Sequence, residues 1–182
     1  SLAGAALIDA RMTLAAMPIA IVAVFGFAIA ALASSPIGIR SGILPLAFAT
    51  AAVFIADIPC RERRAGTLGL AFAAPVIKSR FIAWKLLASL VVATTFVLVP
   101  AVLASRTDVA LLPATAIGVL FIAAMSTALG VASSNPKSFI VLFLTFFYVV
   151  MNDKGSPQLD FAGFHDVATP AVTASYAAVA VL

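Results

Sequence analysis

The densest cluster of charged side chains lies between Cys60 and Lys85, in a stretch that separates two strongly apolar runs. It holds six of the eleven Lys and Arg residues of the chain and one acid, Glu62. Guanidinium and ammonium groups bind carboxylates and phosphates, so this stretch offers recognition of acidic protein side chains or of lipid headgroups. The six cations are Arg61, Arg63, Arg64, Lys78, Arg80 and Lys85.

Signatures of catalysis are missing from the sequence. There is no Gly-x-x-x-x-Gly-Lys-Ser/Thr loop for nucleotide phosphates, no His-Glu-x-x-His motif and no Gly-x-Ser-x-Gly motif. The only histidine, His165, has Asp160 and Asp166 nearby, but we interpret this region as a solvated loop rather than a metal site. The single cysteine, Cys60, excludes an internal disulfide. We therefore predict no catalytic residue, metal or cofactor in this chain.

The composition indicates an all-α integral membrane protein. Apolar residues make up 64% of the chain and charged residues only 10%, against about 25% charged in an ordinary soluble domain. No charge occurs in 12–39, 86–105 or 109–136, and about 20 apolar residues are enough to cross a bilayer as a helix. The net charge of +4 does not indicate a nucleic-acid partner, because the cations lie at the ends of the apolar runs.

Turn signals between the apolar runs predict about six transmembrane helices. They cover 18–34, 41–58, 81–105, 109–132, 138–152 and 167–182. Residues 1–17 are expected to form an interfacial helix, 59–80 a charged loop with a short helix opened by Thr67, and 153–166 a second loop. The last helix would reach only about 24 Å, so we expect it to be incomplete in this chain.

The distribution of cations predicts the orientation of these helices. With both ends of the chain in the cytoplasm, eight of the eleven Lys and Arg residues fall inside, as the positive-inside rule requires. The other three are Arg40, Arg106 and Lys154. Trp84 is then placed at the inner boundary with Lys78, Arg80 and Lys85 as interface anchors, and 59–80 is a cytoplasmic loop.

The charged loop resembles the first cytoplasmic loop of type-2 ATP-binding-cassette (ABC) permeases, a family of exporters. The matching residues are Glu62-Arg63, Gly66-Thr67-Leu68, Pro75, Lys78 or Arg80, and Lys85. Residues 1–17 resemble the elbow helix of that family, and Ser134-Asn135-Pro136-Lys137 its second cytoplasmic turn. Gly69 departs from the pattern, because many relatives have Glu there.

The resemblance implies a permease subunit that dimerises with a second copy or a homologue and pairs with two copies of a cytoplasmic ABC ATPase. ATP and Mg would bind to that ATPase, and the complex would export or flip a substrate, which we expect to be amphipathic or apolar. A multi-pass position in a cell membrane, a bacterial inner membrane, is expected. The ATPase-coupling residues would be Arg61, Glu62, Arg63, Arg64, Gly66, Thr67 and Leu68.

Simpler interpretations remain beside these predictions. The arginines can act only as a topology signal that touches lipid, and Asp57 is more simply a partner of Arg61 or Arg64 than a functional acid. An ion-coupled secondary transporter or a non-transporting membrane scaffold is the alternative function. Four polar residues within spans either line a translocation path or bond to helix backbones, and these are Thr94, Thr95, Ser126 and Thr127.

Overall fold

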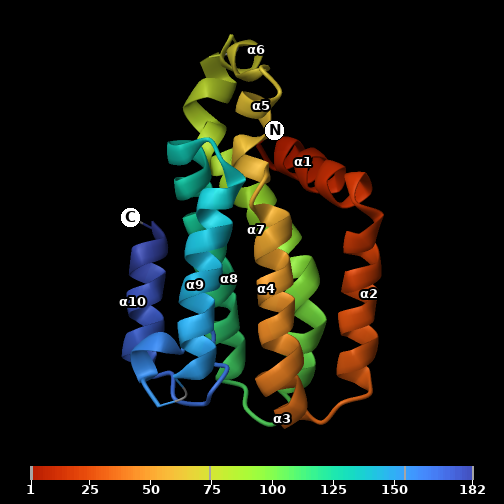
Figure 1. Ribbon diagram of the computed structural model, residues 1–182, viewed down its shortest axis with the longest axis vertical. Coiled ribbons are helices and arrows are strands. Elements are labelled where there is room, and N and C mark those ends of the chain that lie inside the picture. Colours follow the sequence, from red (N-terminus) through yellow and green to blue (C-terminus); the bar gives the residue numbers. More distant parts are fainter. Residues whose placement is uncertain (1, 74, 154, 182) are drawn as a thin grey trace.

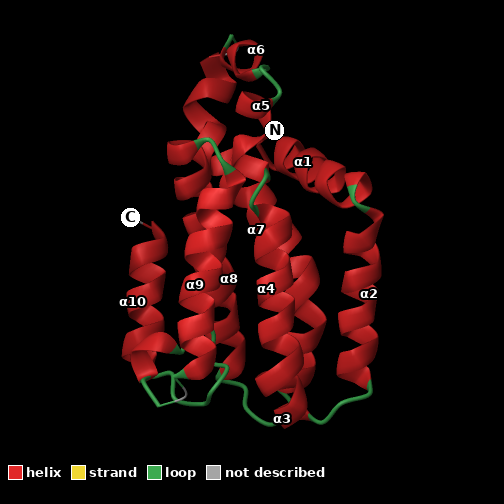
Figure 2. Ribbon diagram, in the orientation of Figure 1, coloured by secondary structure: helices red, strands yellow, loops and turns green. Residues whose placement is uncertain are grey.

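The computed structural model describes residues 2–73, 75–153 and 155–181, which form a helical bundle without a strand in these ranges (Figures 1 and 2). Ser1, Lys154 and Leu182, which the sequence-based predictions included, lie outside the described residues, as does residue 74 of the charged loop. The long helices run side by side along the bundle axis, and α6 forms its tip (Figure 1).

The bundle is built from seven longer helices and a set of short helical turns in the described ranges. The longer helices are α1 (Leu2–Ala16), α2 (Pro18–Leu32), α4 (Leu44–Ile55), α7 (Pro75–Ala104), α8 (Leu111–Ser133), α9 (Pro136–Asn152) and α10 (Pro170–Val181). The short ones are α3 (Pro36–Gly38), the π-helical turn η1 (Ile39–Ile43), η2 (Ile58–Cys60), α5 (Arg61–Arg64), α6 (Leu68–Phe72) and η3 (Pro157–Leu159).

Proline sets several of the helix starts, because its fixed φ suits the first helical turn and its missing N–H is not needed there. Pro18 opens α2, Pro36 opens α3 and Pro136 opens α9, where the Asn135 side chain caps the Lys137 N–H at 3.0 Å. At Met17 the chain turns by 92° between α1 and α2. A separate helix, α1, thus covers most of the predicted range 1–17, and it lies across the end of the bundle (Figure 1); its position at a membrane interface stays a prediction.

Three helical stretches of the described chain are long and apolar enough to cross a membrane. They are Pro36–Arg64, Lys78–Ala104 and Leu111–Ser133, and the bent pair of α1 and α2 counts as a fourth if it is one span. The chain is thus a multi-pass helical membrane protein. Helices α9 and α10 are apolar but have only 17 and 12 residues, so the count of six spans stays a prediction.

The charged loop is shorter than the 59–80 that the sequence predicted. The helical stretch that contains α4 continues through η2 into α5, and α7 begins at Pro75 rather than near Phe81. Proline is favourable at the first position of a helix. The helix therefore begins at Pro75 and includes the polar residues Lys78 and Arg80, which the sequence had placed in the loop. Between α5 and α6 only Ala65 to Thr67 lie outside a helix.

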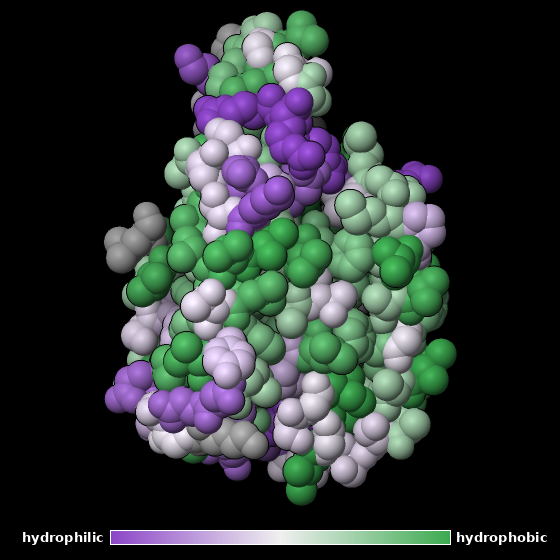
Figure 3. Space-filling view, viewed as in Figure 1, coloured by the Kyte–Doolittle hydropathy of each residue, from purple (hydrophilic) through white to green (hydrophobic). Residues whose placement is uncertain are grey.

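Two hydrophilic bands bracket the apolar body of the molecule. Figure 3 shows one band below the α6 tip and another along the opposite end, with a mainly apolar belt between them. Large apolar side chains remain exposed along the long helices, among them Phe25, Leu46 and Leu98. Such a belt would be unfavourable in water and suits contact with lipid.

Two glycines on α8 allow close contacts with the rest of the bundle. A Cβ at Gly118 would lie 2.7 Å from Ala162 Cβ in the loop before α10, and a Cβ at Gly130 would lie 2.3 Å from Pro59 Cγ. Small residues of this kind let neighbouring segments approach closely in membrane proteins. Gly130 therefore holds η2, and with it α5, against the end of α8.

We predict that Gly130→Ala destabilises the protein by about 1–3 kcal/mol, because the added methyl group has no space beside Pro59. Gly26→Ala is the matched control: nothing lies within 4 Å of a Cβ there, and alanine favours the helix by up to about 1 kcal/mol. Thermal unfolding in detergent measures both. Equal stability of the two variants would contradict the close contact.

Candidate functional site: a buried ionic network below the projecting helix

Lys85 on α7 is the most unusual side chain of the molecule, because it is charged and completely buried. Its Nζ lies 2.7 Å from Asp9 Oδ2 and 2.5 Å from Glu62 Oε1. The ring centroid of Trp84 is 4.3 Å from the same nitrogen. Burial of an ammonium group costs several kcal/mol unless charges and hydrogen bonds replace its water, and here two carboxylates and an aromatic face do so.

Arg61 extends the network on the side of α1. Its Nη1 lies 2.5 Å from Asp9 Oδ1, and its Nη2 donates to Thr13 Oγ1 at 2.7 Å. Asp9 and Thr13 are one turn apart on the same face of α1, so a single guanidinium contacts both. Asp57 pairs with Arg61 at 3.6 Å and with Arg64, as the simpler interpretation of that acid predicted.

We call this set the inner network: Asp9, Asp57, Arg61, Glu62, Arg64 and Lys85. Three acids face three cations; Lys85 and Asp9 are buried, whereas Arg64 is exposed at the edge of the network. The contacts join residues 76, 52 and 23 positions apart in the chain. They tie three elements together at one end of the bundle: α1, α5 and α7.

The segment from α5 to α6 leaves the network and projects from the bundle. Gly66 adopts a left-handed conformation at φ +70°, which glycine allows without strain, and Thr67 N–H donates to Glu62 O at 2.9 Å. This turn directs α6 to the far tip of the molecule (Figure 1). Thr67 precedes α6 as expected, but its hydroxyl contacts Glu62 O at 3.4 Å rather than capping the helix.

The predicted coupling residues divide into an inward and an outward group. Arg61 and Glu62 bind the buried part of the inner network, whereas Arg63 and Arg64 are exposed, with Arg64 reaching the network only through Asp57. Arg63 also hydrogen-bonds to Ser134 Oγ at the end of α8. Gly66 and Thr67 are exposed in the turn, and Leu68 is half-buried at the start of α6.

The predicted interface anchors divide in the same way. Lys78 and Arg80 are exposed near the start of α7, and Trp84 is half-buried. Lys85, in contrast, is not exposed but buried inside the bundle. Sequence reasoning missed its pairing with Asp9; the available signal was that Asp9 is the only acid in the first 56 residues and that Lys85 is the last cation before a long uncharged run.

The polar residues considered for a translocation path mostly satisfy helix backbones. Thr95 and Thr127 donate to carbonyls of their own helices at 2.7 and 2.8 Å. Ser126 on α8 donates to Ile55 O on α4 at 3.2 Å, which is a link between neighbouring helices. Thr94 is exposed on α7. These contacts favour the structural interpretation for three of the four.

The opposite end of the bundle is held by Arg40 of η1. Its Nε donates to Gly163 O at 2.7 Å, and its Nη1 lies 3.2 Å from Asp108 and 3.0 Å from Asp166. Buried Asp160 accepts three backbone N–H groups of the same loop at 3.2 Å each. Within the described ranges no cluster of three or more His, Cys, Asp and Glu side chains could hold a metal ion.

Comparisons of the chain with protein families, curated proteins and solved structures find no match. The candidate spans and the two charged ends of the bundle are those expected of a multi-pass helical membrane protein. A particular activity has to be argued from the network and the projecting segment themselves.

We predict that Lys85→Met lowers the free energy of unfolding by about 3 kcal/mol or more, because it leaves Asp9 and Glu62 buried without their shared cation. Lys78→Met, an exposed cation on the same helix, is the control and should change stability by less than about 0.5 kcal/mol. Chemical denaturation in detergent measures both. A Lys85 variant as stable as the control would show that the network contributes little.

Proposed function

We propose that this chain is the membrane subunit of an ATP-driven ABC exporter, and that α5 and α6 dock a separate cytoplasmic ATPase. The single observation that carries the proposal is the projecting α6, which is joined at its base to α1 and α7 through the inner network.

The character of the tip supports a protein contact. Leu70 is 78% exposed, and Figure 3 shows an apolar tip separated from the apolar body by a hydrophilic band. Leu70 therefore lies beyond the charged band and outside the apolar belt that suits contact with lipid. Exposed apolar surface with a charged rim is typical of a surface that binds another protein.

The network supplies a path from the tip to the membrane helices. Glu62 follows Arg61 in α5, and these two side chains bind Lys85 of α7 and Asp9 of α1. A displacement of α5 by a docked partner would either carry α1 and α7 along or break buried ion pairs at a cost of about 3–5 kcal/mol. Movement with the partner is therefore favoured over separation.

The remaining parts of the proposal follow from the orientation. The end of the bundle that holds α6 also holds most cations, so we place it in the cytoplasm. ATP and Mg would bind to the partner, because this sequence lacks a phosphate-binding loop. Dimerisation, six spans and export or flipping of an amphipathic substrate belong to the same proposal.

A photo-crosslinking amino acid at Leu70, introduced into the protein in its native membrane, tests the docking surface. We expect it to capture a protein whose sequence contains a Gly-x-x-x-x-Gly-Lys-Ser/Thr loop, identified by mass spectrometry. The matched control is the same amino acid at Leu46 on α4, which is also exposed but lies in the apolar belt.

Capture of that ATPase at position 70 and not at 46 is the expected result. Labelling of lipid alone at both positions would contradict docking. Uptake or export that persists in ATP-free vesicles under an imposed pH gradient would instead favour the ion-coupled alternative.

A further inference from the structure

A second charged feature lies beside the inner network, in a cavity between α6, α7 and the end of α8. The cavity has a volume of about 240 Å³, and Arg63, Lys78 and Ser134 are among its lining residues. Its other lining residues are apolar, with Phe81 and Val131 among them, and no carboxylate lines it. The nearby acids Asp57 and Glu62 are engaged by cations of the inner network.

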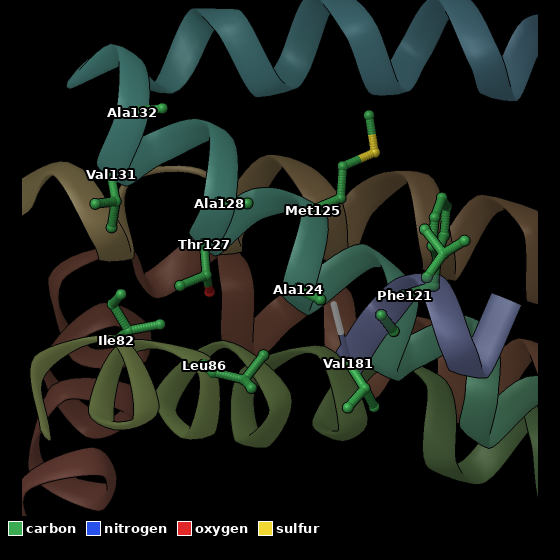
Figure 4. Close-up of a pocket in the computed structure, with 12 residues that line it drawn as sticks. Ile82, Leu86, Phe121, Ala124, Met125, Thr127, Ala128, Val131, Ala132 and Val181 are labelled. Carbon is green, nitrogen blue, oxygen red and sulfur yellow. The ribbon is translucent and has the colours of Figure 1, made fainter.

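A larger apolar cavity continues from this one along α7 and α8. It has a volume of about 560 Å³, and both cavities are lined by Ile82 and Val131. Figure 4 shows Ile82 and Val131 at one end of the larger cavity and Val181 of α10 at the other. Thr127 is the one polar residue among its lining residues, and its hydroxyl already donates to Ala123 O.

The two cavities together match the layout of a phospholipid, in which an anionic headgroup is followed by an apolar acyl chain. Cations lie at the end nearest the charged band, and an apolar groove follows towards the middle of the bundle. From Ser134 to Phe121 this surface runs about 20 Å along α8, more than half of the roughly 30 Å hydrocarbon thickness. Basic pockets between membrane helices on the cytoplasmic side bind anionic headgroups.

We propose that this composite site binds an anionic phospholipid, with its phosphate between Arg63 and Lys78 and one acyl chain along Ile82, Leu86 and Ala128. Arg63 carries five N–H donors, of which one reaches Ser134, and its charge also offsets the negative end of the α8 dipole there. The proposal needs α7 and α8 to span the membrane, but it does not depend on the ATPase.

The single tryptophan of the chain reports on this site. Trp84 packs against Phe81 with ring centroids 5.9 Å apart, and Phe81 lines the headgroup cavity. We would place the full chain in phosphatidylcholine nanodiscs in which a small fixed share of the lipid is brominated, either as phosphatidylglycerol or as phosphatidylcholine. Bromine on the acyl chain quenches tryptophan fluorescence on close approach.

Stronger quenching by the brominated anionic lipid than by the zwitterionic one is expected. Combining Arg63→Gln with Lys78→Gln should weaken the preference about fivefold for each cation removed. The control combines Arg11→Gln with Lys137→Gln, which removes the same charge from exposed positions and should keep the preference. Val131→Phe retains both cations but fills the junction of the cavities, and it should reduce quenching without a change of charge.

Equal quenching by the two lipids in the unmodified chain would overturn the proposal and leave the cavity to a protein contact of α6. If the control variant lost the preference for anionic lipid to the same extent, the preference would reflect only the general attraction of the charged end for anionic lipid, and the specific site would be contradicted. If soluble glycerol phosphate relieved the quenching, Arg63 and Lys78 would bind a free phosphate rather than a lipid headgroup.

Discussion

The pairing of Lys85 with Asp9 and Glu62 is the interaction on which the rest of the structure depends. An ammonium group in an apolar helix cannot stay charged in the bundle without nearby anions. The two anions come from the first helix and from the segment after α4, far away in sequence. The bend after α1, the path of η2 and the start of α7 must therefore be compatible with one another.

This constraint also explains why the projecting segment is positioned rather than loose. Gly130 admits Pro59 at close range, so η2 is held against α8, and α5 follows it into the network. Gly66 then turns the chain outward. The result is a short apolar helix beyond the charged band, whose base is tied to α1 and α7 by ion pairs.

Local patterns predicted much of this fold. Uncharged runs indicated the long helices, Pro18 marked the start of α2, and Asp57 was assigned its arginine partners from spacing alone. Pro136 was expected in the turn before the fifth span, but it opens α9. Lys85 was expected to be an exposed anchor like Lys78 and Arg80; its burial arises from α1, 76 residues away in sequence, which no local pattern reveals. The outward direction of α6 depends on one left-handed glycine and could not be read from hydropathy.

A double-mutant cycle on Asp9→Asn and Lys85→Met tests the central claim most directly, because it isolates the energy that the two side chains share. Unfolding free energies of the unmodified chain, both single variants and the pair would be measured under the same detergent conditions. We expect a coupling free energy above about 1.5 kcal/mol for this buried pair. Additivity within about 0.5 kcal/mol would contradict it.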